Sequence, residues 1–119
     1  MGWTVAQHNR FKRELSKLDS RDADAILAAL ARVRDQLDRI GSLDPRKVFS
    51  SGVLAPIPDL QPLHASGIPG SYRLRVGRHR VALALLPAER LILLTVAARR
   101  DDSTYDKLPE LHRKRFNER

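Results

Sequence analysis

The sequence predicts an α+β fold, in which an antiparallel meander of three strands packs on two N-terminal helices and a C-terminal helix follows. Residues 72–76 and 80–85 alternate between apolar and charged or small side chains, which is typical of strands with one buried face. Residues 26–40 instead repeat their apolar side chains at helical spacing. Turn-forming residues at Gly77 and Pro87 separate the strands, and we expect helices to cover the apolar face of the sheet.

The charged side of the meander carries arginines at regular offsets. Successive side chains of a strand point to opposite faces, so Arg73 and Arg75 share one face while the apolar residues between them share the other. In the next strand Arg80 is followed on its own face by Ala82 and Ala84. The first two strands therefore predict a sheet face with three guanidinium groups over small side chains.

The third run, residues 91–100, is apolar on both faces, which predicts a central strand. If Ile92, Leu94 and Val96 join the apolar core, Arg99 falls on the same side as the three earlier arginines. The alternation thus predicts one face with four arginines around a floor of alanines and a threonine. These arginines are Arg73, Arg75, Arg80 and Arg99.

Two helices are expected before the meander, after a short strand at residues 3–6. Phe11, Leu15 and Leu18 form the stripe of the first helix, and Ser20 is suited to cap the second. Gly41 stands where the second helix is expected to end. The stripe of the second helix consists of Ile26, Leu30, Val33, Leu37 and Ile40.

Residues 41–62 are expected to form a proline-rich loop or insertion. They contain four of the seven prolines, and the connection exceeds the ~12 to 15 residues of an ordinary loop. After the meander, Asp101 or Asp102 is suited to cap a short helical turn that carries Tyr105. Pro109 is suited to open a final basic helix, which we expect to fray because it is only weakly amphipathic.

Composition indicates one small domain, residues 1–119, with an excess of positive charge. The formal net charge is +8, and residues 73–119 hold twelve Lys and Arg against six Asp and Glu. Such an excess favours a polyanionic partner, of which nucleic acid is the commonest. The chain lacks cysteine, an apolar run of ~20 residues and a signal-like N-terminus, so we expect a cytoplasmic protein without membrane contact.

Several classes of catalytic site have no support in the sequence. Phosphate-binding loops, dinucleotide-binding glycine motifs, HExxH zinc sites and GxSxG serine elbows are absent. The four histidines are scattered without ligand spacing, and neither a metal nor an organic cofactor is expected. The arginine-bearing meander remains as the candidate site.

The order of these elements resembles the RelE/ParE superfamily of toxins from type II toxin–antitoxin systems. The resemblance covers roughly residues 3–108, with the proline-rich loop as the main departure. It rests on the YRLRVG segment at 72–77, the arginine of the next strand, and an arginine six residues before a tyrosine in ARRDDSTY at 98–105. It implies a small RelE-like fold and a cognate antitoxin as partner, with DNA reached only through the antitoxin.

Two activities occur in this superfamily. RelE-like members are ribosome-dependent endoribonucleases that cut mRNA in the A site, whereas ParE-like members inhibit DNA gyrase. The filled site positions favour the nuclease, with ParE-like gyrase inhibition as the alternative and a non-toxic basic nucleic-acid-binding module as the third interpretation. The codon preference, the identity of the antitoxin and the role of the proline-rich loop are left open.

The resemblance also implies roles for individual residues. Arg73, Arg75, Arg80, Arg99 and Tyr105 fall on RelE's catalytic positions, and Arg78, Arg100 and Lys107 are expected to contact RNA or ribosome from the surface. The chain departs from RelE where Arg73 and Arg75 replace lysines. A lysine can lose its proton in a cationic site, whereas an arginine cannot, so Tyr105 is the expected base or proton shuttle.

Overall fold

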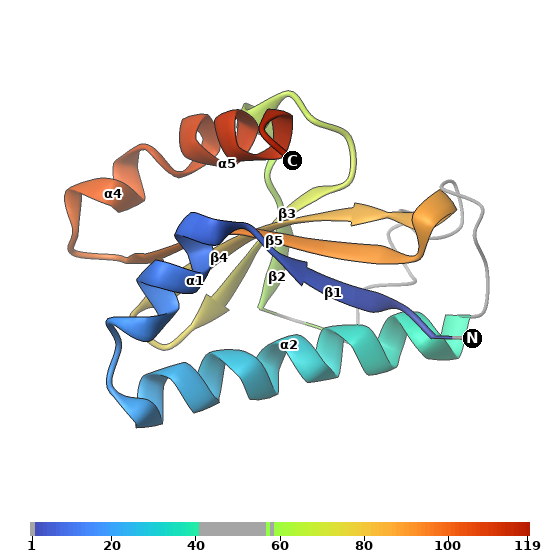
Figure 1. Cartoon of the computed structure of the whole chain (residues 1–119), viewed down its shortest axis with the longest axis horizontal. Helices are drawn as coiled ribbons and strands as arrows, with labels where there is room; N and C mark the ends of the chain where they lie inside the picture. Colours follow the sequence, from blue (N-terminus) through green and yellow to red (C-terminus); the bar gives the residue numbers. More distant parts are fainter. Residues whose placement is uncertain (1, 41–56, 58) are drawn as a thin grey trace.

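A five-stranded mixed sheet lies at the centre of the part of the chain that the structure describes (Figure 1). The computed structural model describes residues 2–40, 57 and 59–119. Its helices and strands, in chain order, are β1 (Thr4–Gln7), α1 (Asn9–Ser16), α2 (Ser20–Ile40), β2 (Leu60–Pro62), β3 (Ser71–Val76), β4 (His79–Leu86), β5 (Leu91–Arg99), α4 (Ser103–Asp106) and α5 (Leu108–Asn117). Short 3₁₀ turns occupy His64–Ser66 and Pro87–Glu89. The α+β prediction is confirmed.

The predicted meander forms the core of this sheet. The strand order is β1-β5-β4-β3-β2, with β3, β4 and β5 joined in antiparallel pairs. β1 adds a parallel strand beside β5, and β2 adds a short antiparallel strand beside β3. β5 is therefore an interior strand with a neighbour on each side, as its apolar sequence predicts.

Helices cover both faces of the sheet (Figure 1). α2 lies on one face and α5 on the other, so the structure has two apolar clusters. The larger cluster joins Phe11 of α1 and the α2 stripe to the apolar side of the meander. The smaller cluster joins Leu63 and Leu108 to β4 and β5 on the opposite face. A two-sided sheet of this kind needs apolar residues on both sides of its central strand.

The beginning of α2 differs by one residue from the prediction. Ser20 is the first helical residue, and Asp19 caps the helix because its Oδ1 accepts a hydrogen bond from the Asp22 backbone amide at 2.9 Å. Asp and Ser are comparable N-caps, so the sequence alone did not separate them. The core stripe is confirmed from Ile26 to Leu37, since Ile26, Leu30, Val33 and Leu37 are all buried. The side chain of Ile40 and the predicted helix end at Gly41 lie outside the described part of the chain.

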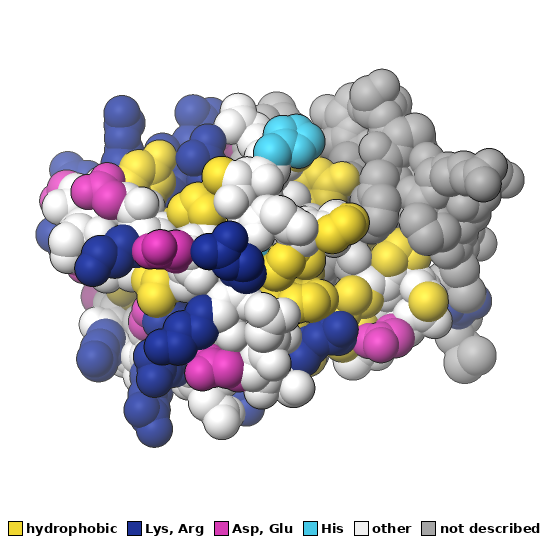
Figure 2. Space-filling view, turned by 90° about the horizontal axis from the view of Figure 1, so that it is seen from above, with side chains coloured by type: hydrophobic (Ala, Val, Ile, Leu, Met, Phe, Trp, Pro, Cys, Tyr) yellow, Lys and Arg dark blue, Asp and Glu magenta, His cyan; other side chains and the backbone are white. Residues whose placement is uncertain are grey.

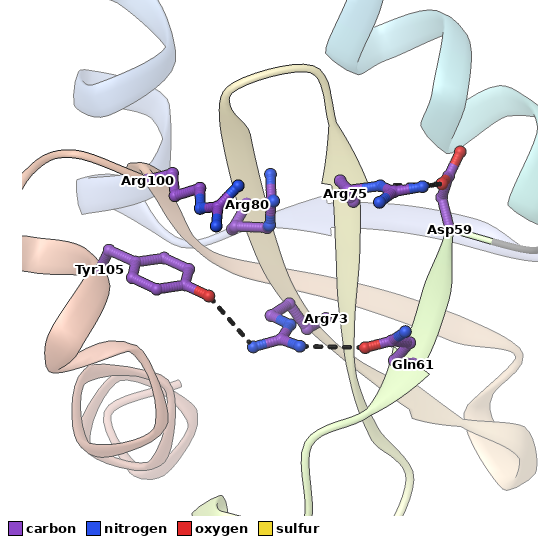
Figure 3. A pocket seen from close by; sticks show the side chains of 7 residues that line it. All are labelled: Asp59, Gln61, Arg73, Arg75, Arg80, Arg100 and Tyr105. Carbon is purple, nitrogen blue, oxygen red and sulfur yellow. Dashed lines mark hydrogen bonds and ion pairs between the residues drawn. The ribbon is translucent and has the colours of Figure 1, made fainter.

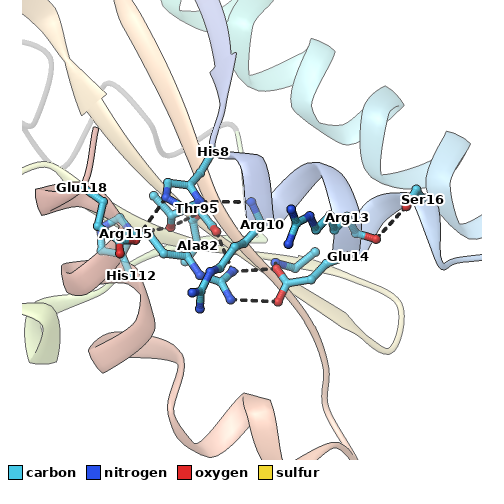
Figure 4. Close-up of polar contacts among 11 residues, drawn as sticks. His8, Arg10, Arg13, Glu14, Ser16, Ala82, Thr95, His112, Arg115 and Glu118 are labelled. Atoms are coloured by element: carbon cyan, nitrogen blue, oxygen red, sulfur yellow. Dashed lines mark hydrogen bonds and ion pairs between the residues drawn. The ribbon is translucent and has the colours of Figure 1, made fainter.

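The C-terminal helix is anchored, and the expectation that it frays was wrong. His112 is fully buried, with its Nε2 2.7 Å from Ser71 Oγ and its Nδ1 2.6 Å from Thr95 Oγ1. Arg115 donates to the Thr95 carbonyl oxygen at 2.9 Å and to both carboxylate oxygens of Glu14 (Figure 4). Polar residues therefore bind α5 to the sheet. An apolar stripe in their place would have been visible in the sequence. Burial lowers the pKa of His112 to about 4.

The proline-rich segment is only partly described. Most of the predicted loop at 41–62 lies outside the described residues. Its last three residues correct the prediction, because Leu60–Pro62 form β2 at the edge of the sheet. Proline is tolerated on an edge strand, where its missing N–H removes no ladder bond.

None of the helices in the described part of the chain combines the length and apolar content that a bilayer span requires.

Candidate active site

A polar cavity of about 260 Å³ lies over the arginine-bearing face of β3 and β4 (Figure 3). It is open to solvent between β2 on one side and α4 on the other. Its lining residues are Asp59, Gln61, Arg73, Arg75, Arg80, Arg100 and Tyr105. Four guanidinium groups against one carboxylate give these residues a formal charge of +3. A cavity of this charge suits an anionic ligand such as a phosphodiester.

Arg73 connects the two sides of the cavity. Its Nη1 donates to the Tyr105 hydroxyl oxygen at 3.4 Å, and its Nη2 donates to Gln61 Oε1 at 3.0 Å. Gln61 is the cross-strand neighbour of Arg73. Tyr105 is brought to the cavity by α4, which begins at Asp102 because the Asp102 carboxylate accepts from the Thr104 amide at 3.3 Å. This cap confirms the expected helical turn.

Arg75 forms an ion pair at the opposite end of the cavity from Tyr105. Its Nε and Nη2 both donate to Asp59 Oδ1, at 3.1 and 2.8 Å. The side chains are 63% and 39% exposed, and pairs exposed to this degree contribute only ~0 to 1 kcal/mol to stability. A phosphate can therefore compete with Asp59 for Arg75 at little cost to the fold.

Arg80 is the most buried arginine of the cavity. Its side chain donates to the carbonyl oxygens of Gly77 and His79, at 2.9 and 3.0 Å. These bonds fix the guanidinium beside the β3–β4 hairpin, where Arg80 is also the cross-strand neighbour of Arg75. Three of the predicted catalytic arginines thus lie together, as the strand alternation indicates.

The prediction that Arg99 shares this face was wrong. In the β4–β5 register Ala82 pairs with Val96 and Leu83 pairs with Leu94, so Thr95 is an extra, bulged residue. Beyond Thr95 the two faces of β5 exchange. Val96 therefore belongs to the cluster under α5 rather than to the α2 core.

The bulge places Arg99 on the α2 face and Arg100 in the cavity. Arg99 lies in a separate depression with Asp22 and His79, and its Nε donates to Asp101 Oδ1 at 2.6 Å. That hydrogen bond raises the pKa of Arg99 and lowers the pKa of Asp101. Arg100 takes the position predicted for Arg99. Its backbone amide donates to the Arg78 carbonyl oxygen at 2.7 Å, and its guanidinium makes no hydrogen bond or ion pair with another described residue.

The remaining predicted RNA-contacting residues lie outside the cavity. Arg78, at the tip of the β3–β4 hairpin, lines a shallow depression with Arg100 and Asp101. Lys107 is exposed at the end of α4, two residues after Tyr105. In the view from above, Lys and Arg side chains gather at the end of the molecule where α4 lies, with acidic side chains among them (Figure 2).

Sequence reasoning missed two lining residues, Asp59 and Gln61. Both fall in the segment predicted as a loop, although the alternation of polar, apolar and polar residues at 59–61 is a short strand signal. In the part of the chain that the structure describes, no group of three or more His, Asp or Glu could hold a metal ion.

The sequence matches no protein-family model and no curated protein. Among solved structures, the chain is similar to a chain in the crystal structure of the toxin–antitoxin complex RelBE2 from Mycobacterium tuberculosis. The TM-score is 0.52 at 17% sequence identity, and the match covers 84% of this chain and 100% of that chain. The protein therefore has a RelE-like fold, as the sequence predicts.

Proposed function

We propose that the protein is the toxin of a type II toxin–antitoxin system and acts as a ribosome-dependent mRNA endoribonuclease. The observation that carries this proposal is the cavity itself, where four arginines share the lining with Tyr105 and one of them, Arg73, bonds to its hydroxyl group. The RelE-like fold supports the toxin role. The nuclease role rests on the chemistry that these side chains can perform.

Cleavage of RNA by its own 2′-hydroxyl group needs positive charge around the reacting phosphate. The 2′-oxygen attacks the adjacent phosphorus, negative charge grows on the non-bridging oxygens, and the 5′-oxygen leaves. Guanidinium groups bind such oxygens through paired N–H donors and keep their charge throughout the reaction. Arg73, Arg80 and Arg100 supply these donors from three different elements of the cavity. The reaction requires no metal ion, because the arginines stabilise the developing charge.

Proton transfer needs a different kind of side chain. An arginine does not exchange its proton in a protein, so the arginines of the cavity cannot serve as acid or base. Tyr105 lies within hydrogen-bond reach of Arg73 and carries a hydroxyl group that can exchange a proton. We assign it as a proton-transfer group of the reaction. Arg78 and Lys107 are assigned to the RNA backbone or the ribosome. Both are exposed, Arg78 lines a depression with Arg100, and Lys107 follows Tyr105 by two residues.

A cognate antitoxin is the proposed protein partner. The similar RelBE2 structure is a toxin–antitoxin complex. A cavity with several exposed cations suits an acidic or amphipathic antitoxin segment that covers it and prevents RNA from entering. Binding through these arginines is expected to weaken as salt increases, and an affinity that is independent of salt would exclude them from the interface.

The proposal is tested by incubating the purified protein with programmed ribosomes and mapping the mRNA by primer extension. Discrete breaks in the A-site codon, with a 2′,3′-cyclic phosphate on one product and a 5′-hydroxyl on the other, are expected. A parallel gyrase supercoiling assay should show no inhibition. Intact mRNA together with gyrase inhibition would instead establish a ParE-like activity. If mRNA stays intact and gyrase is not inhibited, the third interpretation, a basic nucleic-acid-binding module, is favoured.

A further inference from the structure

We propose that Asp59 is the general base of the cavity and that Tyr105 is the general acid. This inference rests on the proposed ribonuclease function and deepens it. In the step, the Asp59 carboxylate takes the proton of the ribose 2′-hydroxyl as the bond from the 2′-oxygen to phosphorus forms. The bond from phosphorus to the 5′-oxygen breaks, and the 5′-oxygen receives the proton of the Tyr105 hydroxyl.

The side chains of the cavity leave few choices for these roles. Of the seven lining residues, four are arginines and one is the amide Gln61, and neither type exchanges protons with a substrate. The remaining two are Asp59 and Tyr105. Near neutral pH a carboxyl group ordinarily has no proton and can accept one, whereas a phenol ordinarily has a proton and can donate it.

The positions of the two groups fit an in-line displacement, in which the attacking and leaving oxygens lie on opposite sides of phosphorus. Asp59 enters the cavity from the β2 side and Tyr105 from the α4 side, with the arginines between them (Figure 3). Arg73 extends across this interval, bonded to Tyr105 at one end and to Gln61 on the β2 side at the other. We therefore place the 2′-oxygen of a phosphate bound by these arginines on the β2 side and its 5′-oxygen on the α4 side.

The contacts of Asp59 leave part of its carboxylate for a ligand. Both bonds from Arg75 end on Oδ1, and no described residue bonds to Oδ2. The Asp59 backbone is fixed as well, because its carbonyl oxygen accepts from the Arg75 amide at 2.9 Å. The carboxylate is partly exposed. Oδ2 is therefore the oxygen left to accept the proton of a 2′-hydroxyl, while the bonds to Oδ1 keep the side chain in place.

An alternative role for Asp59 predicts an effect of opposite sign. If Asp59 only occupies Arg75 until a phosphate displaces it, removal of its charge will strengthen RNA binding and leave the cleavage step unchanged or faster. If Asp59 is the base, Asp59→Asn will slow cleavage at saturating ribosomes by ~10²- to 10⁴-fold, the range for loss of a general base. Binding should not weaken, because the substitution removes a negative charge.

The test is single-turnover cleavage of mRNA on programmed ribosomes by the parent, Asp59→Asn, Asp59→Glu and Tyr105→Phe. Asp101→Asn is the matched control, since Asp101 pairs with Arg99 outside the cavity and loses the same charge. Asp59→Glu retains a carboxylate and should cleave faster than Asp59→Asn. Melting temperatures should differ little among the Asp59 variants, because its ion pair is exposed.

A second substrate separates the base from the acid. An mRNA with sulfur in place of the 5′-oxygen at the mapped cleavage site has a leaving group that needs no proton. On this mRNA the cleavage rate of Tyr105→Phe should recover to within about tenfold of the parent rate, because the leaving group no longer needs a proton. The cleavage rate of Asp59→Asn should stay ~10²-fold or more below the parent rate, because the 2′-hydroxyl still needs a base.

Asp59→Asn that cleaves the ordinary mRNA at the parental rate overturns the assignment and leaves the nuclease function intact. Recovery of Asp59→Asn, rather than Tyr105→Phe, on the sulfur substrate reverses the two roles and also overturns it. A parent protein that leaves ordinary mRNA uncut overturns the proposed function and this inference together.

Discussion

Two arginine–carboxylate pairs in this protein differ in almost every respect except their chemistry. Arg115 and Glu14 join α5 to α1 across the sheet, with side chains 7% and 23% exposed. Arg75 and Asp59 join β3 to the start of β2, with side chains 63% and 39% exposed. The shortest N–O distance is 2.8 Å in both pairs. The difference therefore lies in the surroundings of the two pairs.

The buried pair belongs to a network with fixed partners. Arg115 also donates to the Thr95 carbonyl oxygen, and Glu14 also accepts from the Ala97 amide at 3.0 Å. Removal of one member would leave a buried charge without its counterpart, which is costly. Among the described residues Arg75 and Asp59, the open pair, do not belong to such a network, and either side chain can bind a ligand instead. The comparison indicates that the buried pair maintains the fold and that the open pair is available to a ligand.

The largest expected effect is a loss of activity without a loss of stability. Tyr105→Phe keeps the aromatic ring and removes the hydroxyl group, so single-turnover cleavage on programmed ribosomes should slow by ~10²- to 10⁴-fold. The melting temperature should stay near that of the parent, because Tyr105 is only partly buried. A variant with the parental cleavage rate would remove Tyr105 from the reaction.

The reverse outcome is expected for the buried pair. Arg115→Ala leaves Glu14 and the Thr95 carbonyl oxygen without their donor, and it should lower the free energy of unfolding by ~3 to 5 kcal/mol in urea titrations. Arg75→Ala should lower it by ~1 kcal/mol or less. The double variant Glu14→Gln with Arg115→Met should recover part of the loss. Equal effects of the two single variants would contradict the comparison.

Neighbouring arginines at the end of β5 and just after it sharpen the boundary of the cavity. Arg100→Ala removes a cavity guanidinium and should slow cleavage by an amount on the order of 10²- to 10³-fold, as for a lost oxyanion donor. Arg99→Ala should change cleavage little, because Arg99 lies on the α2 face. The assay is again single-turnover cleavage at saturating ribosomes. A larger effect from Arg99→Ala than from Arg100→Ala would indicate that β5 has no bulge and that Arg99 faces the cavity.

Acid should weaken the attachment of α5. Burial holds the pKa of His112 at about 4, below the ordinary value of 6.5 given for an unfolded chain. Between these values the unfolded chain binds more protons, so stability is full above about pH 6.5 and declines by ~3 kcal/mol towards pH 4. Urea titrations at several pH values should show a shallower decline for His112→Gln. Parallel pH profiles for the parent and this variant would exclude His112 as the cause.

Much of the fold could be predicted because its signals are local. The alternation at 72–76 places Arg73 and Arg75 on one face whatever the rest of the chain does. The α2 stripe fixes its buried side in the same way. The edge strand β2 was missed because three residues ending in Pro62 provide too little pattern to separate a strand from a loop.

The site was predicted less completely, because one residue depends on contacts that are distant in the chain. The bulge at Thr95 is supported by His112 and Arg115, which bond its hydroxyl group and its carbonyl oxygen. Both belong to α5, whose docking through polar side chains leaves no periodic signal. A one-residue shift exchanges the faces of a strand, so this single feature exchanged Arg99 for Arg100.

The parallel pairing of β1 with β5 has a consequence for when the sheet and the cavity form during synthesis. Val5 pairs with Ile92, so the first strand to be made has no partner until the last strand of the sheet has been translated. Pairings of this separation form late, because a long stretch of chain must be ordered before they contribute. Arg100 and Tyr105 follow the same strand. A nascent chain therefore has neither a complete sheet nor a complete cavity until most of its length has been synthesised.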